Sequence, residues 1–323
     1  MRLLQSTVCL ALAVILFVFL PGLAHAADTE LWTQWRGGEQ NGVADGGDYP
    51  TEWSEESGVT WSTELQGRGG STPVVAKGKA FLTAGTNVEG SGGENLLIAI
   101  DLASGKELWT TKIGSDVGGR HKKGSGANPS AVTNGESVYA YFRSGDLACV
   151  DFDGEIQWHV NLQKQFGEDT LWWDLGSSPT LINDLVVVAV MQTGPSYVVA
   201  FDQKTGEQVW KADRDLGAPK EAAQSYATPV ALKEQNMIAV MGADHLTIHA
   251  AEDGRELGRV GGFNPTEHEY FRSISSPAAE GDFIVCPYSR GATVTTCRIS
   301  DVVAGKGRDS IVWFRDDLGL SLI

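Results

Sequence analysis

One short segment recurs along this chain, and it constrains the fold more than any other feature. Residues 200–210 read Ala-Phe-Asp-Gln-Lys-Thr-Gly-Glu-Gln-Val-Trp, and residues 99–109 read Ala-Ile-Asp-Leu-Ala-Ser-Gly-Lys-Glu-Leu-Trp. Shorter versions occupy 149–158 and 249–258, and the last of these has lost its Trp. The pattern predicts a hairpin, because Asp satisfies turn backbone groups, Gly tolerates positive φ and Trp supplies a large surface to bury.

The spacing of this repeat predicts the fold class. Its Trp position recurs in steps of 48, 49, 52, 48 and 55 residues, at Trp61, Trp109, Trp158, Trp210, Gly258 and Trp313. A second marker, a Pro after a small polar residue, runs in phase at Pro73, Pro129, Pro179, Pro229 and Pro277. Four short strands per unit of about 45 to 50 residues are typical of a propeller blade. We therefore predict an all-β fold, a β-propeller of four-stranded antiparallel blades.

The two ends of the repeat region predict an incomplete ring. Five blades are recognisable within residues 61–319, and Trp61 adds an orphan outer strand before the first of them. Only ten residues follow Trp313, too few for the three inner strands that Trp61 lacks. We expect a truncated chain with an open, apolar blade face and a short tail at 320–323. The alternative is a five-bladed ring with an accessory N-terminal strand.

The first 26 residues are typical of a secretory signal. Arg2 precedes an apolar run from Val8 to Leu20, and the small-x-small sequence at 24–26 predicts cleavage after Ala26. The alternative is a membrane anchor, but the run is short for a spanning helix and no later stretch is long enough. We therefore expect a periplasmic or secreted protein with no membrane span.

Charge disfavours one class of partner. The chain has a formal net charge of −16, and removing the signal, whose only charge is Arg2, leaves −17. Such an acidic protein is a poor ligand for nucleic acid or for an anionic membrane surface.

Three cysteines remain after the signal. Cys149 lies in an apolar strand and is expected to be a buried small hydrophobe. Cys286 and Cys297 flank a predicted turn at 289–291, where they either form a cross-strand disulfide or stay free. The sequence contains neither Cys-x-x-Cys-His nor two adjacent cysteines.

Residues 27–60 form a lead-in segment before the repeats. It opens with Trp32-Thr33-Gln34-Trp35-Arg36-Gly37. Arg36 either stacks on an aromatic ring or pairs with a carboxylate, or the whole segment is simply packed against the propeller. We favour the packed segment.

The loops before the innermost strands carry the candidate site, because in a propeller these loops open onto one end of the central channel. Four of them combine aromatic, charged and amide side chains, which suits a ligand or peptide platform. The alternative is that Trp172 or Trp173 belongs to the core and the charged side chains are only solvated. The candidate residues are His121, Lys122, Lys123, Trp172, Trp173, Asp174, Gln224, Tyr226, His268, Tyr270 and Arg272.

Metal and catalytic motifs are weak in this sequence. His245 and His249 are four residues apart, but they lie in a predicted strand, where helical zinc-ligand spacing does not apply. We find no nucleophile triad, Gly-rich phosphate loop or carboxylate pair, and we predict neither a metal site nor catalytic residues.

The repeat Ala-x-Asp-x-x-Thr-Gly-x-x-x-Trp, with Ser-x-Pro opening the unit, resembles the PQQ-like β-propeller repeat over about residues 30–317. The lead-in is similar to that of bacterial exported members. The resemblance implies kinship with quinoprotein dehydrogenases and with BamB-type outer-membrane assembly scaffolds, which usually have eight blades. The dehydrogenases hold a quinone against Trp, beside adjacent disulfide-bonded cysteines, a calcium ion on Glu and Asn, and a catalytic Asp. This chain has no matching motif, and it lacks the lipid-acceptor cysteine of the scaffolds.

From these observations we predict an exported, non-catalytic scaffold that needs no cofactor and binds a protein or peptide at its channel face. The alternatives are a PQQ- and calcium-dependent quinoprotein dehydrogenase and a non-functional fragment of such a propeller.

Overall fold

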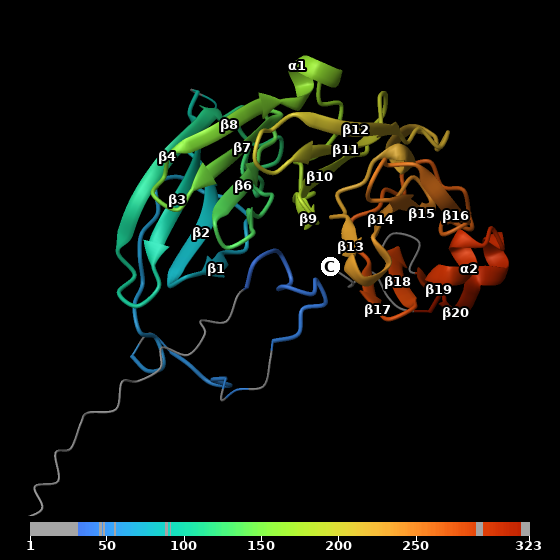
Figure 1. Ribbon diagram of the computed structural model, residues 1–323, viewed down its shortest axis with the longest axis horizontal. Coiled ribbons are helices and arrows are strands. Elements are labelled where there is room, and N and C mark those ends of the chain that lie inside the picture. The colour runs from blue at the N-terminus through green and yellow to red at the C-terminus, as the bar shows by residue number, and fades with distance from the viewer. Residues whose placement is uncertain are drawn as a thin grey trace, which may run out of the picture.

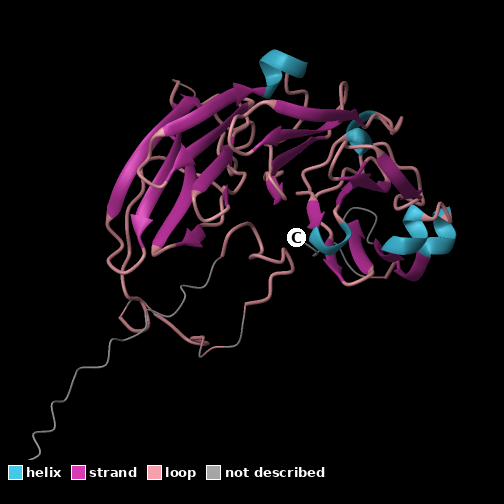
Figure 2. Cartoon of the chain, viewed as in Figure 1, coloured by secondary structure: helices cyan, strands magenta, loops and turns pink. Residues whose placement is uncertain are grey.

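Five antiparallel sheets follow one another around an arc in the computed structural model (Figure 1). The structure describes residues 32–44, 47, 49–54, 56–87, 90, 92–288 and 293–317, so the predicted signal and tail lie outside it. Strands make up nearly all of the regular structure (Figure 2). The predicted all-β propeller fold is confirmed.

Each sheet, called blade 1 to blade 5 below, consists of four strands that are consecutive in the chain. Their bounds are β1 (Val74–Ala76), β2 (Lys79–Gly85), β3 (Glu94–Asp101), β4 (Glu107–Ser115), β5 (Val132–Thr133), β6 (Ser137–Tyr141), β7 (Asp146–Asp151), β8 (Ile156–Asn161), β9 (Thr180–Ile182), β10 (Leu185–Val190), β11 (Tyr197–Asp202), β12 (Gln208–Asp213), β13 (Val230–Leu232), β14 (Met237–Gly242), β15 (His245–Ala250), β16 (Glu256–Gly261), β17 (Ala278–Glu280), β18 (Phe283–Tyr288), β19 (Thr293–Arg298) and β20 (Ile311–Arg315).

The helices are short. They are α1 (Leu162–Phe166), α2 (Ile299–Val303) and the 3₁₀ turns η1 (Lys220–Ala223), η2 (Lys233–Gln235) and η4 (Gly307–Ser310). Within the described part of the chain, none of them has the length and apolarity needed to cross a bilayer.

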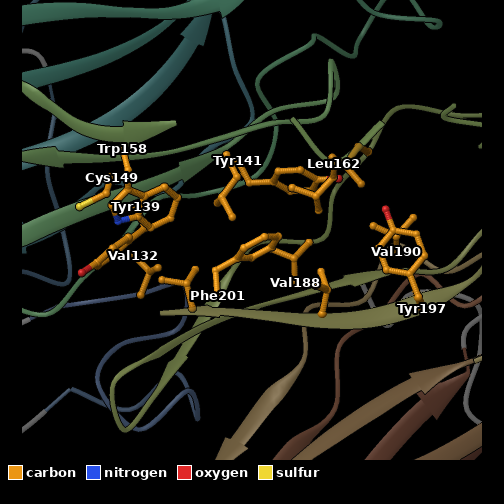
Figure 3. Packing of buried hydrophobic residues seen from close by; sticks show 14 of the residues in the cluster. Val132, Tyr139, Tyr141, Cys149, Trp158, Leu162, Val188, Val190, Tyr197 and Phe201 are labelled. Carbon is orange, nitrogen blue, oxygen red and sulfur yellow. The ribbon is translucent and has the colours of Figure 1, made fainter. Parts of the chain in front are cut away.

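The hydrophobic core lies between blades. Strand β10 is buried at all of its positions, as its unbroken apolar sequence predicts for a strand covered on both faces. One face of this blade meets blade 2, where Tyr139 and Trp158 lie opposite Val188 and Phe201 (Figure 3). This hydrophobic cluster is formed by two neighbouring blades, as is typical of repeat folds.

The Trp and the Gly of the repeat form one contact, here called the Trp–Gly dock. The indole Nε1–H of each docked Trp donates to a backbone carbonyl of the following blade at 2.9 Å. A β-carbon on the facing Gly would lie 2.3 to 2.9 Å from the indole ring, so no larger residue fits. The pairs are Trp61 with Gly105, Trp109 with Gly154, Trp158 with Gly206, and Trp210 with Gly254.

The repeat that lost its Trp has a different contact. At Gly258 a β-carbon would lie 2.1 Å from the carbonyl oxygen of Val302 in α2. The buried side chains of Ile299 and Val302 occupy this interface. In blade 5, helix α2 therefore takes the place of the Gly-containing turn that the other blades have. Only glycine at position 258 can lie against this helix, because any side chain there would overlap Val302.

In the second marker of the repeat, the residue that joins neighbouring blades is a Ser or Thr with its hydroxyl group, not the proline. In blades 2 to 5 the hydroxyl of the Ser or Thr two residues before the innermost strand accepts the backbone N–H of its counterpart in the preceding blade at 2.8 to 3.0 Å. The ladder runs through Thr72, Ser130, Ser178, Thr228 and Ser276. Blade 2 uses Ser130, which is followed by Ala131, so aligning Pro129 with the other prolines was wrong by two residues.

The lead-in segment contacts the innermost strands of blades 1 to 4 and the two residues that precede the innermost strand of blade 5. Trp32 O and Thr33 O accept the backbone N–H groups of Val75 and Thr133 at 2.8 Å. Gln40 donates to Thr180 in blade 3 and accepts the N–H of Ala231 in blade 4. Figure 1 shows the segment, in blue, inside the arc.

Arg36 joins the lead-in to the last blade. Its guanidinium lies 4.3 Å from the Trp35 ring centroid and donates to the carbonyls of Ser276 and Pro277 at 3.3 Å. It therefore stacks on an aromatic ring, and its hydrogen bonds go to backbone carbonyls.

The orphan outer strand predicted at Trp61 was wrong. Trp61 docks on Gly105, and Thr63 donates to the Gly105 carbonyl, but residues 59–65 form no strand. A strand needs a hydrogen-bonded neighbour, and none of the described sheets includes this segment. Trp61 and Leu65 instead cover the apolar face of blade 1 as a plain loop.

The possible disulfide is also absent. Cys286 and Cys297 are free and buried, and the register of β18 and β19 places them opposite Thr295 and Ile284, not opposite each other. Burial raises the pKa of Cys297 to about 11, so this thiol stays protonated near neutral pH.

The outer face of blade 5 is open. Trp313 occupies the Trp position, yet 45% of its surface is exposed, and Phe283 and Val285 beside it are also exposed. Figure 1 shows an arc whose first and last sheets are not neighbours, which matches the incomplete ring and not the closed five-bladed alternative.

Blade 4 contains a buried polar chain. Arg214 donates Nε–H to Thr247 Oγ1 at 2.8 Å, and Thr247 Oγ1 lies 2.9 Å from His249 Nε2. Because a carbonyl only accepts, His249 Nδ1 donates to the Gly254 carbonyl, and in the neutral ring Nε2 then accepts from the Thr247 hydroxyl. Burial, with a smaller contribution from Arg214, lowers the pKa of His249.

The Trp–Gly dock predicts the effect of a single methyl group. We expect Gly206→Ala to lower the free energy of unfolding by about 2 to 4 kcal/mol, because its β-carbon would overlap the Trp158 ring. Gly217→Ala is the matched control, since Gly217 has a similar positive φ but open space around it. Urea unfolding measures both, and equal losses would show that backbone strain, not the dock, governs the position.

The buried imidazole predicts a pH dependence. Because the folded-state pKa of His249 is lowered, the unfolded chain takes up this proton first, and stability falls as the pH drops below about 6.5. We expect His249→Gln to reduce the loss of unfolding free energy between pH 7.5 and 5.5. Urea titrations at the two pH values measure it, and an unchanged slope would contradict the assignment.

Candidate functional site at the channel mouth

Four loops meet at one end of the channel and form what is here called the rim. They are residues 116–131, 167–179, 214–229 and 262–277, and each leads into the innermost strand of blades 2 to 5. Backbone bonds join neighbouring loops: Ser225 pairs with Ser273 in a parallel bridge, and Tyr226 N donates to Ser273 O. The topology therefore brings together loops about 50 residues apart in sequence, as predicted.

Asp174 and Asp169 anchor the loop that carries the two tryptophans. Asp174 accepts the backbone N–H groups of Arg120 and His121 at 2.5 and 3.1 Å. Asp169 pairs with Arg120 at 3.1 Å and with Arg143 at 3.3 Å. These contacts fix the backbone on both sides of the tryptophans.

Glu221 links three loops. Its carboxylate is buried, accepts Trp173 Nε1–H at 2.8 Å and pairs with the largely buried guanidinium of Arg272. The Arg272 guanidinium also lies 5.1 Å from the Trp173 ring centroid. One carboxylate therefore holds an indole and a cation in fixed positions.

Gln224 and Tyr226 support the same loop from below. Fully buried Gln224 accepts the Trp172 backbone N–H and the Tyr226 hydroxyl, both at 3.0 Å. The Tyr226 hydroxyl in turn accepts the Trp173 N–H at 3.2 Å, and burial raises the pKa of Tyr226 above its ordinary range. Both side chains thus hold the tryptophan loop in place, and half-buried Tyr226 also faces the channel cavity described below.

The rim exposes three large aromatic side chains. Trp172, Trp173 and Tyr270 are 48%, 41% and 38% exposed, which excludes the alternative that the tryptophans are core residues. Trp172 and Tyr270 lie 6.2 Å apart between ring centroids, and His121 lies 5.9 Å from Trp173. Large apolar surface on a rigid frame is well suited to binding another chain.

The remaining candidates lie at the edge. Lys122 and Lys123 are exposed, and neither forms an ion pair within the described residues. His268 stacks on Phe271 at 4.1 Å, and its Nδ1 accepts the Tyr270 N–H. His268 therefore orients the Tyr270 loop.

Sequence reasoning missed Glu221 and Asp169. Both lie in polar stretches that read as solvated loop, and nothing local shows that each meets an arginine far away in the chain. The one sequence signal that could have indicated them is that each lies a few residues before an aromatic candidate residue.

Below the rim the channel contains a cavity of about 230 Å³ with an uncharged lining. The lead-in contributes Trp35 to its wall, and the ladder residues contribute small hydroxyls. The full lining is Trp35, Gly70, Asn128, Ser130, Gly176, Ser178, Tyr226, Thr228, Ile274 and Ser276. No charged side chain is among them.

The described residues contain no cluster of three or more His, Cys, Asp or Glu side chains suited to a metal ion. His245 and His249 bond to backbone carbonyls through Nδ1. They lie on one strand, and both are used in local hydrogen bonds.

Comparison with known proteins identifies the family to which this chain is related. The family described as outer membrane protein assembly factor BamB matches residues 26–213 and, in an overlapping match, 92–260. The chain belongs to this family. The match includes the Trp–Gly docks and most of the rim.

The relatives fall into two kinds. The chain is 33% identical over 152 residues to outer membrane protein assembly factor BamB of Burkholderia pseudomallei (strain K96243), covering 46% of this chain and 32% of that protein. It is 26% identical over 187 residues to quinohemoprotein alcohol dehydrogenase ADH-IIG of Pseudomonas putida, covering 54% of this chain and 24% of that protein. The chain thus spans about a third and a quarter of these relatives.

A solved structure shares the fold. The quinohemoprotein alcohol dehydrogenase ADHIIG from Pseudomonas putida HK5 superposes with a TM-score of 0.57 at 14% identity, covering 79% of this chain and 43% of that chain. Identity this low supports the fold alone.

The buried carboxylate of the rim predicts a large mutational effect. Glu221→Gln leaves the Arg272 guanidinium buried without its counter-charge, so we expect a loss of about 3 to 5 kcal/mol in unfolding free energy. Glu269→Gln is the control, because its pair with Lys220 is exposed and screened by solvent, so its loss should change the unfolding free energy far less. Urea unfolding of the two variants compares them, and similar losses would contradict this account of Glu221.

Proposed function

We propose that the protein is an exported, non-catalytic scaffold whose rim binds a segment of a partner protein. The observation that carries the proposal is the rigid aromatic surface of Trp172, Trp173 and Tyr270, since exposed aromatic groups held by buried polar contacts bind with little loss of conformational entropy. The BamB relative, named as an assembly factor, supports a protein partner. The predicted signal supports a periplasmic or secreted location.

The dehydrogenase alternative is supported by the similarity to ADH-IIG. The channel cavity fits that cofactor poorly. PQQ carries several carboxylates, and none of the cavity-lining residues is a cation that would neutralise them or a carboxylate that would hold its calcium. The cavity of about 230 Å³ is also smaller than usual ligand pockets, which start at about 300 Å³. We therefore derive no reaction step for this chain.

The scaffold proposal predicts that bound peptides depend on the rim. Peptides selected from a random display library on the immobilised mature chain should bind with micromolar affinity and lose at least about tenfold in a Trp172→Ala, Tyr270→Ala double variant, because two aromatic anchors are removed. Trp53→Ala is the control, since Trp53 is exposed but lies in the lead-in. Calorimetric titration gives the affinities. Selected peptides that bind the double variant equally well would refute the site.

The enzyme alternative is tested separately by incubating the chain with PQQ and calcium and following bound-quinone absorbance and dye-linked alcohol oxidation. Stoichiometric quinone with turnover would replace the scaffold proposal.

A further inference from the structure

A buried carboxylate at the junction of blades 1 and 2 has no cationic partner. Asp116 follows β4 directly and is 4% exposed. Its Oδ1 accepts Gly118 N–H and its Oδ2 accepts Asn87 N–H, both at 2.8 Å. Within the described residues it forms no ion pair. Buried charges are normally paired or bound to a metal ion, so we expect this carboxylate to have a positively charged partner.

Two amide oxygens nearby also lack partners. Asn95 is 0% exposed, and its Nδ2 donates to Ser115 O and Ser144 Oγ, which fixes the amide orientation. Its Oδ1 and the buried Oδ1 of Asn87 accept no hydrogen bond. Buried acceptors are satisfied in the great majority of cases, so two unsatisfied amide oxygens on residues that neighbour Asp116 indicate a missing hydrogen-bond donor or cation.

Asp116 lies close to both asparagines. Asp116 Oδ1 and Asn95 Oδ1 lie 2.0 and 3.5 Å from the point that a β-carbon on Gly126 would occupy, so both oxygens face Gly126 and the carboxylate fills the place where a side chain would lie. Asn87 is bonded to Asp116 twice, through its backbone N–H and through Nδ2 to Asp116 O at 3.0 Å. The nearby Arg143 guanidinium is engaged with Gly118 O and Asp169.

We propose that Asp116, Asn95 and Asn87 form a site for a hard, oxygen-preferring cation of the Ca²⁺ class. Carboxylate and amide oxygens are the ligands that Ca²⁺ takes, at about 2.3 to 2.6 Å and in flexible geometry. With a single carboxylate the affinity is weak, with a Kd on the order of 1 mM. The site is separate from the channel cavity and does not depend on peptide binding.

The position of the site indicates what the cation does. Asp116 begins the rim loop that carries residues 121–123. Asn87 follows the end of β2 and Asn95 lies at the start of β3, so both are at the adjoining end of the blade 1 sheet. A cation shared among them joins the base of this loop to the sheet. A bound cation therefore orders one of the four rim loops, residues 116–131.

Calcium titration of the mature chain tests the proposal by calorimetry and thermal unfolding. At 10 mM Ca²⁺ we expect the Tm to rise by about 2 to 4 °C, and by less in Mg²⁺, which demands a tighter octahedron. Asp116→Asn should abolish the rise. Asp215→Asn is the matched control, because exposed Asp215 makes the same bond to the N–H two residues on, at Gly217.

A second variant covers the case in which Asp116→Asn does not fold. Asn95→Asp adds a second carboxylate to the site, so we expect its Ca²⁺ affinity to be about tenfold higher than that of the unmodified chain. Cleavage by endoproteinase Lys-C after Lys122 or Lys123 should slow in Ca²⁺, which reports loop order directly. No Tm rise in the unmodified chain, or an equal rise in Asp116→Asn, would overturn the proposal and assign the space to an ordered water molecule.

Discussion

The fold depends on an indole lying flat against a glycine of the next sheet. The contact combines a large buried aromatic surface with one hydrogen bond, and it recurs wherever the repeat keeps both residues. Because each blade contacts mainly its neighbours, this dock and the hydroxyl ladder set the angle between successive sheets. The rim exists because that angle brings four loops to one end of the channel.

Much of this could be predicted from residues alone, for identifiable reasons. The period of the Trp and Pro markers and the unbroken apolar run of β10 are local patterns, and local patterns report strands and blades reliably. The loops of the candidate site followed from topology once the blades were counted. The exposure of Trp172 and Trp173 did not follow, because either a core or a surface role was consistent with the sequence.

What sequence reasoning missed depends on contacts between distant residues. The buried pairing of Glu221 with Arg272 joins two loops in different blades, and nothing near Glu221 marks it as buried. The Cys286–Cys297 pair depended on strand register, where an offset of two residues decides whether the thiols face each other. Trp61 kept its dock but not its strand, since docking needs one glycine whereas a strand needs a neighbour.

The docks also give the molecule a direction. Each docked indole points from one blade to the next along the chain, so the arc has a donor end, marked by exposed Trp313, and an acceptor end, where Gly105 is already occupied by Trp61. The two ends are chemically unlike, as are the ends of a polar filament. Loss of blades 4 and 5 would uncover the indole of Trp210, whereas loss of the lead-in and blade 1 would leave the face of Gly154 without its tryptophan. Losses from opposite ends would therefore have unlike results, an aggregation-prone protein in the first case and a less stable one in the second.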